Sequence, residues 1–286
     1  PDGLCLLTLE LMGDDGGTAT QSLTVTVDSS LRVRYRSIWH AAPGFLYGYG
    51  LDPLPPAHGQ VSLLGAGVIT TLDSATVARF PIKLSTRFGV GGNTEVALYG
   101  SLVSNTAPVL DRWGGGAAVT WVPLRLGSLP QFAGGISAGA SYRSPDLNNV
   151  YSGPDTLADF PGFSLATPMA LVLGPVQLTL APEFRLAPAP IATSTSSPSE
   201  NVWTPYAYLK SALALDSRNI MVAASTSMHT TPLSQAFSIE PPVQAGIELH
   251  WILPKSSLVV SGFAAGEFES WTDFYVMGGG GISVLF

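Results

Sequence analysis

Cationic residues recur at a spacing that suits one face of a β-strand. Arg79, Lys83 and Arg87 lie four residues apart along one segment. Because successive side chains of a strand point to opposite faces, this spacing places the three cations in a single row. Two interpretations are open: the row selects anions, or acidic side chains on neighbouring strands neutralise it. The candidate acidic partners are Glu95, Glu183 and Glu267.

Serine and histidine residues offer hydrolytic chemistry as an alternative. His229 lies close to Ser225 and Ser227, as a lipase site would require. However, no Gly-x-Ser-x-Gly motif occurs in the chain, and strand alternation sets His250 on the same face as Glu248. This arrangement predicts a hydrogen bond between His250 and Glu248 rather than a lipase site. We therefore expect no catalytic residue.

The sequence contains no recognisable motif for binding a cofactor or a metal ion. Cys5 is the only cysteine, and no CxxC motif or Cys/His cluster occurs, so we expect neither an internal disulfide nor a metal site. The formal net charge of −7 argues against nucleic-acid binding, because that function usually needs a basic stripe. We therefore expect no cofactor and no nucleic-acid partner.

Alternation with a period of two defines the strands that position these side chains. The clearest case is the segment 82–103, which has a Gly-Gly-Asn hairpin turn at 91–93. A single register satisfies its apolar and polar faces and sets Arg87 diagonal to Glu95. The predicted cross-strand pairs are Val90 with Thr94, Phe88 with Val96, Thr86 with Leu98, Ile82 with Leu102, Gly89 with Glu95, and Ser85 with Tyr99.

The same alternation recurs along the chain from residue 58 onward. Short turns alternate with longer polar or proline-rich loops, which is typical of a transmembrane β-barrel with short periplasmic turns and longer extracellular loops. We therefore predict an all-β, antiparallel transmembrane barrel of twelve strands. The predicted strands are 59–71, 75–90, 94–104, 116–126, 131–143, 164–173, 176–187, 204–215, 220–230, 242–252, 257–269 and 274–286.

Residues 1–57 are assigned to a β-rich N-terminal segment, and residues 58–286 to the barrel. Thr24–Val27 and Leu31–Trp39 also alternate, and as two further barrel strands they would raise the strand number to fourteen. The stretch that follows is too long for a typical periplasmic turn and contains Pro43, Pro53, Pro55 and Pro56. We therefore favour a segment that plugs the lumen or lies beneath the barrel.

Charged residues are scarce and fall on one face of the strands. They make up 12% of the chain, against roughly 25% in soluble domains. On the lipid-facing side of a barrel, Lys or Arg at the bilayer midplane costs roughly 2–4 kcal/mol, so the charged face must point inward. The predicted lumen-lining residues are Arg79, Lys83, Arg87, Glu95, Glu183, Arg185, Lys210, Glu248, His250 and Glu267.

The last strand carries apolar residues at alternate positions before a terminal aromatic residue. Ile282, Val284 and Phe286 share one face. This pattern resembles the C-terminal β-signal of outer-membrane proteins of Gram-negative bacteria. The resemblance covers only this strand, and it implies a porin-like or transporter barrel in the bacterial outer membrane. It also implies that the outer-membrane assembly machinery inserts the barrel into the lipid bilayer.

Transport is the function that these observations favour. A twelve-stranded barrel lies between eight strands, whose interior is filled by side chains, and sixteen strands, which leave an open channel. We therefore predict a narrow pore or transport channel for small solutes. The alternative is a barrel that does not conduct and acts as a membrane anchor, with its N-terminal segment or its loops bound to a partner protein. A lipid hydrolase is the least favoured function.

Overall fold

The regular elements of the chain are β-strands throughout the described residues. The structure is a computed structural model and describes residues 3–12, 18–27, 48–72, 75–105, 112–127, 129–142, 161–190, 201–217, 219–230, 239–254, 256–268 and 274–286. In these ranges, no helix is long and apolar enough to cross a membrane. The chain divides into two compact units, residues 1–37 and residues 38–286.

The first unit contains a two-stranded antiparallel sheet. β1 (Gly3–Met12) pairs with β2 (Thr18–Val27) along its full length. The predicted strand Thr24–Val27 forms the end of β2, whereas the candidate strand Leu31–Trp39 lies outside the described residues. Because β1 and β2 form a sheet of their own, they do not add strands to the barrel.

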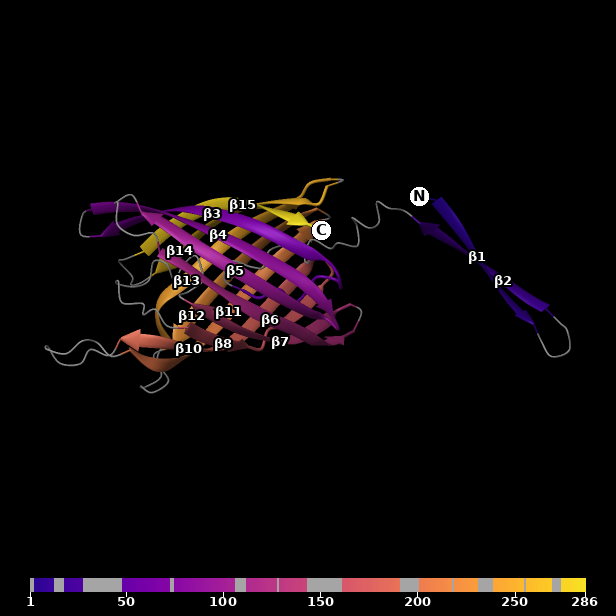
Figure 1. Cartoon of the computed structure of the whole chain (residues 1–286), viewed down its shortest axis with the longest axis horizontal. Helices are drawn as coiled ribbons and strands as arrows, with labels where there is room; N and C mark the ends of the chain where they lie inside the picture. The colour runs from indigo at the N-terminus through magenta and orange to yellow at the C-terminus, as the bar shows by residue number, and fades with distance from the viewer. Residues whose placement is uncertain are drawn as a thin grey trace. The chain divides into compact units, whose positions relative to one another are not determined.

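The second unit contains a closed antiparallel barrel (Figure 1). Apart from β8 and β9, which both lie between β7 and β10, each strand pairs with the next, and β15 pairs with β3 to close the sheet. Counting β8 and β9 as one interrupted strand, the barrel has the predicted twelve strands. The elements are β3 (Gly59–Leu72), β4 (Ala75–Gly91), β5 (Thr94–Asn105), β6 (Arg112–Leu126), β7 (Gln131–Tyr142), β8 (Pro161–Ala166), β9 (Met169–Leu173), β10 (Val176–Pro190), β11 (Asn201–Ser217), β12 (Ile220–Thr230), β13 (Ile239–Ile252), β14 (Leu258–Phe268) and β15 (Phe274–Leu285).

The interruption between β8 and β9 occurs at Thr167 and Pro168. Proline has no backbone N–H and cannot donate to a strand ladder. Both elements nevertheless pair with β7 on one side and β10 on the other. Two backbone bonds bridge the gap, from Thr167 N to Pro182 O at 3.0 Å and from Gly135 N to Pro168 O at 2.9 Å. The barrel wall is therefore continuous here.

The β4–β5 hairpin confirms all but one of the predicted pairs. Phe88 lies opposite Val96, and the pairs of Thr86, Ile82, Gly89 and Ser85 are also as predicted. The predicted pair of Val90 with Thr94 is wrong, because the register shifts after Gly89 and places Gly91 opposite Thr94. Gly91 has a φ of 102°, a conformation that glycine adopts without strain and that allows this bulge.

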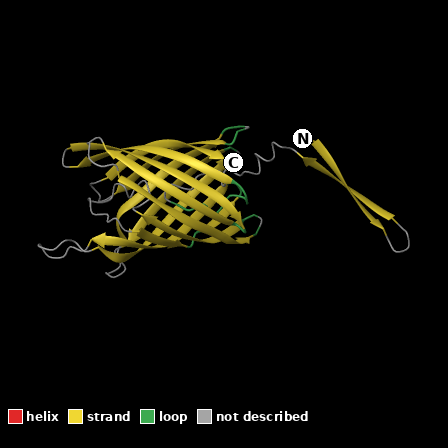
Figure 2. Ribbon diagram, viewed as in Figure 1, coloured by secondary structure: helices red, strands yellow, loops and turns green. Residues whose placement is uncertain are grey.

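The outward face of the barrel is apolar and exposed. Leu84 is 52% exposed, and large apolar residues occupy the same face around the barrel. They include Leu63, Leu98, Ile136, Leu165, Leu178, Leu213, Val222, Ile247, Val260 and Ile282. Short turns lie at the barrel end that also holds the C-terminus (Figure 2). Exposed apolar residues outside and buried polar residues inside are the features of a transmembrane barrel.

The last residue closes the barrel seam. Backbone bonds join Gly59 N to Phe286 O at 2.8 Å and Phe286 N to Gly59 O at 2.9 Å. The Phe286 ring lies over Gly59, where a Cβ would overlap with it, and makes an edge contact with Phe88 at 6.0 Å between centroids. The aromatic side chain therefore covers the point where the first and last barrel strands meet.

Replacing Phe286 with alanine should weaken this seam. An aromatic pair contributes about 0.5–1.5 kcal/mol beyond area burial, and we expect the free energy of unfolding in urea to fall by about that amount relative to Val276→Ala. Val276 is the matched control, because it is exposed on the same face of β15. Equal losses in the two variants would contradict the role of the ring contact.

Candidate functional site in the barrel lumen

A segment of the chain lies inside the barrel next to the first barrel strand. We call residues 48–58 the lumen segment. Its Leu51 is 1% exposed and its Leu54 is 4% exposed, although neither belongs to a strand. Pro53, Pro55 and Pro56 limit the backbone of this segment and leave fewer N–H groups that need partners. An apolar and proline-rich segment can therefore lie in the lumen at little cost in unpaired backbone groups.

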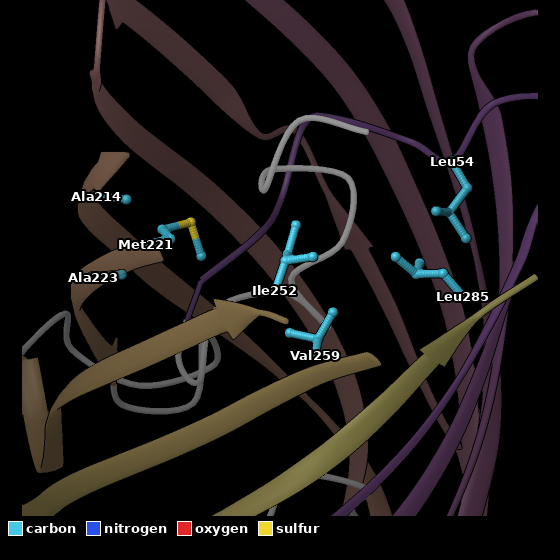
Figure 3. Close-up of a cluster of buried hydrophobic side chains, with 7 residues drawn as sticks. All are labelled: Leu54, Ala214, Met221, Ala223, Ile252, Val259 and Leu285. Carbon is cyan, nitrogen blue, oxygen red and sulfur yellow. The ribbon is translucent and has the colours of Figure 1, made fainter. Parts of the chain in front are cut away.

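The two leucines contact different parts of the barrel wall. Leu51 packs with residues of β6, β7 and β9, namely Val122, Ala133 and Ala170. Leu54 belongs to a cluster inside the ring of strands (Figure 3), with Ala214, Met221, Ala223, Ile252, Val259 and Leu285. Full burial of a leucine contributes about 1.5–3 kcal/mol. The lumen segment therefore packs against two separate groups of strands, β6, β7 and β9 through Leu51 and strands between β11 and β15 through Leu54.

A buried ion pair at the short-turn end holds the lumen segment through its backbone. Arg87 donates to both carboxylate oxygens of Glu95, from Nε to Oε1 at 2.7 Å and from Nη2 to Oε2 at 2.8 Å. Its Nη1 donates to Gln60 Oε1 at 2.8 Å. Glu95 Oε2 also accepts a hydrogen bond from the backbone N–H of Leu54 at 3.0 Å. The predicted proximity of Arg87 and Glu95 is therefore present, with the lumen segment bound to the same carboxylate.

A second set of contacts binds the lumen segment three residues earlier in the chain, at Leu51 and Asp52. Arg125 lies on β6 and donates from Nη2 to the carbonyl oxygen of Leu51 at 2.9 Å. Its guanidinium also pairs with Asp52, from Nη1 to Oδ1 at 3.3 Å. Both side chains are partly exposed, at 29% and 17%. This pair therefore guides the segment more weakly than the buried pair of Arg87 and Glu95.

A third cluster lies in the middle of β10 and β11. The Tyr49 hydroxyl donates to Glu183 Oε2 at 3.0 Å. Glu183 pairs with Arg185, from Nη2 to Oε1 at 2.8 Å, and with Lys210, from Nζ to Oε2 at 2.9 Å. The Arg185 guanidinium lies 4.4 Å from the ring centroid of Tyr208. Burial raises the pKa of the Tyr49 hydroxyl above its ordinary value, so this hydroxyl stays protonated and donates.

The predicted contact between Glu248 and His250 is also present. His250 Nε2 lies 3.2 Å from Glu248 Oε2, and His250 Nδ1 lies 2.8 Å from Ser261 Oγ. Ser225 Oγ donates to Glu248 Oε1 at 3.1 Å. All four residues are buried, and Ser225 is thereby bound to Glu248. The side chain of His229 lies outside the described residues.

The structure gives fewer contacts for the other predicted lumen-lining residues and for the residues of the C-terminal pattern. Lys83 points inward, with Nζ 5.5 Å from the ring centroid of Tyr99. Arg79 lies opposite Val68, and Glu267 lies opposite Gln244, but the side chains of Arg79 and Glu267 lie outside the described residues. The predicted row of three cations is therefore described at two positions. Ile282, Val284 and Phe286 are exposed on the outward face, and their recognition by an assembly machinery stays a prediction.

Part of the polar inner face of the barrel is shielded from solvent. Polar residues on the inner face of many strands are less than a tenth exposed: Ser62, Ser137, Gln177, Thr179, Ser225, Ser227, Ser261 and Ser283. Neighbouring side chains therefore cover these positions, whereas inner-face residues such as Tyr99, Thr120 and Lys210 remain partly exposed. Among the described residues, no three His, Cys, Asp or Glu side chains come together as a metal site.

Several residues of the site were absent from the sequence prediction. They are Tyr49, Leu51, Asp52, Leu54, Gln60 and Arg125. Most of them lie in or contact the proline-rich stretch, which has no strand periodicity. One usable signal is composition: residues 48–58 carry a single formal charge, Asp52, and two leucines. Such a stretch is unusually apolar for a solvent-exposed loop.

Comparison with solved structures finds similar barrels at low sequence identity. The translocator domain of the autotransporter NalP from Neisseria meningitidis has 14% identity and a TM-score of 0.48, over 82% of this chain and 90% of that chain. The KdgM porin has 9% identity and a TM-score of 0.41, over 78% and 98%. The outer membrane protein OpdK from Pseudomonas aeruginosa has 8% identity and a TM-score of 0.38, over 80% and 98%. These similarities concern the fold alone.

Sequence comparisons add no relationship. No protein-family model matches the chain, and no curated protein matches it in sequence.

Proposed function

We propose that the barrel spans a bacterial outer membrane and forms a narrow passage for small solutes, which its own lumen segment keeps closed. The observation that carries this proposal is the binding of residues 48–58 to wall charges. Glu95 accepts from Leu54 N, Glu183 accepts from Tyr49, and Arg125 binds Asp52. The apolar outward band supports the membrane location, because it suits lipid better than water.

The wall remains largely satisfied without the lumen segment, which supports a closure that can open. Glu95 keeps its bidentate bond to Arg87, and Glu183 keeps Arg185 and Lys210. Departure of the segment therefore leaves these buried charges paired. The main cost is exposure of two leucines, about 3–6 kcal/mol in total, which keeps the closed state dominant.

Replacing residues 48–56 with a Gly/Ser stretch of equal length should open the passage. The substitute lacks the leucines and the side chains that bind the wall, so it leaves the lumen. Single-channel recordings in planar bilayers should change from mostly closed to steadily conducting. A chain without residues 1–37 is the matched control, because it keeps residues 48–58, and it should stay closed.

A second candidate function is that of an anchor that does not conduct. The separate compact unit of residues 1–37 favours it, because such a unit can bind a partner protein at the membrane surface. The same recordings separate the two functions. If the Gly/Ser variant folds, shown by a heat-dependent shift in gel migration, and still conducts nothing, the anchor is the better description. Ser225, Glu248 and His250 are buried on the inner face of the barrel, away from the lipid-facing side that a lipid hydrolase would use, which argues against that function.

A further inference from the structure

Tyr49 lies in a polar site built by the barrel wall. Its hydroxyl donates to Glu183 Oε2 at 3.0 Å, and the Lys210 Nζ atom lies 5.1 Å from its ring centroid. The Glu183 side chain has no exposed surface. A buried carboxylate is a strong acceptor for a phenol hydroxyl, and a lysine over the ring adds a cation–π contact. The site therefore contacts both the hydroxyl group and the aromatic ring of a phenol.

The wall orients this site without help from Tyr49. Arg185 donates from Nε and Nη2 to Glu183 Oε1, at 3.0 and 2.8 Å. Lys210 Nζ lies 2.9 Å from Glu183 Oε2, the same oxygen that accepts from Tyr49. The Arg185 guanidinium packs on the Tyr208 ring. Because these contacts join wall residues of β10 and β11, the carboxylate stays in place when Tyr49 is absent.

The backbone around Tyr49 gives this side chain freedom to leave. Gly48 and Gly50 flank it in the sequence. A Cβ added to Gly50 would meet no atom within 4 Å, so packing does not demand glycine there. Glycines on both sides of one residue increase the range of backbone conformations that this residue can sample. Tyr49 therefore resembles a tethered ligand more than a fixed wall residue.

We propose that this mid-lumen site binds small solutes that carry a p-hydroxyphenyl group, and that Tyr49 occupies it as an internal ligand. The inference rests on the proposed function, because it names the class of solute that the passage takes. A solute of this class displaces Tyr49 by making the same hydrogen bond to Glu183 and the same ring contact with Lys210. A solute without the hydroxyl leaves Glu183 with one bond fewer.

The test measures binding of p-cresol and toluene to the folded Tyr49→Ala chain in detergent by titration calorimetry. The two probes differ by one hydroxyl, and a hydrogen bond to a charged group makes p-cresol bind about tenfold to hundredfold more tightly. Wild type and Tyr49→Phe should bind p-cresol at least about tenfold more weakly, because a ring already fills the site. Tyr99→Ala is the matched control, since it vacates a ring-sized space beside Lys83.

Two results would overturn this proposal: equal affinity of Tyr49→Ala for both probes, and equal p-cresol binding by Tyr99→Ala. If Tyr49→Ala refolds poorly, p-cresol present during refolding should restore the yield and toluene should not; equal effects of the two would also overturn the proposal. These outcomes do not depend on conduction. A barrel that binds p-cresol and never conducts refutes the passage, whereas one that conducts without preferring p-cresol refutes this site alone.

Discussion

Replacing Glu95 with alanine should lower the free energy of unfolding of the barrel by about 3–5 kcal/mol, because it leaves a buried charge without its partner. Arg87 would keep its bond to Gln60 but lose both bonds to the carboxylate. The Leu54 N–H would lose its acceptor at the same time. The variant therefore weakens both the wall and the attachment of the lumen segment.

Urea unfolding followed by tryptophan fluorescence measures this loss. Asp52→Ala is the matched control, because it breaks a partly exposed pair with Arg125, and such pairs contribute about 0–1 kcal/mol. The double variant Arg87→Met/Glu95→Leu should lose less stability than Glu95→Ala, since it removes both charges together. A loss in Glu95→Ala no larger than in Asp52→Ala would show that this pair behaves like a surface ion pair.

The hairpin around Arg87 and Glu95 could be predicted from sequence because its determinants are local. Alternation assigns each side chain to a face, and the Gly-Gly-Asn turn fixes the register within a residue or two. Phe88 opposite Val96 follows from these two rules, and so does the proximity of Arg87 to Glu95. The error at Val90 arose where a bulge adds one residue to the strand, which alternation cannot reveal.

The sequence offered the lumen as one of two positions for the N-terminal segment, but the contacts of residues 48–58 could not be predicted because their determinants are distant and partly independent of residue type. Tyr49 and Glu183 are 134 residues apart in the chain, and no local pattern links them. Leu54 binds Glu95 through its backbone N–H, and Leu51 binds Arg125 through its backbone carbonyl. Almost any residue offers these groups. The proline-rich composition identified an unusual segment, while its position depends on the closed barrel around it.

Replacing Gly89 with alanine should weaken the attachment of the lumen segment to the barrel wall. Gly89 lies on the inner face of β4, and a Cβ there would overlap with the carbonyl oxygens of Leu54 and Pro55 and lie 2.7 Å from the Pro55 carbonyl carbon. Gly89 also bonds the segment directly, donating to His58 O at 3.0 Å and accepting from Ala57 N at 3.1 Å. Because every atom in the way is backbone, no side-chain rotation can relieve the overlap.

The expected result is a larger open fraction in a barrel that stays mostly closed. An overpacked site costs about 1–3 kcal/mol, which multiplies the open fraction by about 5 to 150 when the cost falls on the closed state. Single-channel recordings should show a matching rise in open time. A second readout is the rate at which a bulky maleimide labels Leu54→Cys in a Cys5→Ser background. This labelling rate should rise together with the open time.

Gly100→Ala provides the matched control for this substitution. Gly100 lies on the adjacent strand β5, where an added Cβ would come no closer than 3.8 Å to the Gly114 carbonyl oxygen, so its open time should equal that of wild type. If Gly89→Ala lowers stability but leaves open time and labelling unchanged, the segment has moved with the wall and does not gate the lumen. A rise in both open time and labelling rate would instead show that the contact between Gly89 and residues 54–58 holds the lumen closed. The substitution adds one methyl group and deletes no polar group.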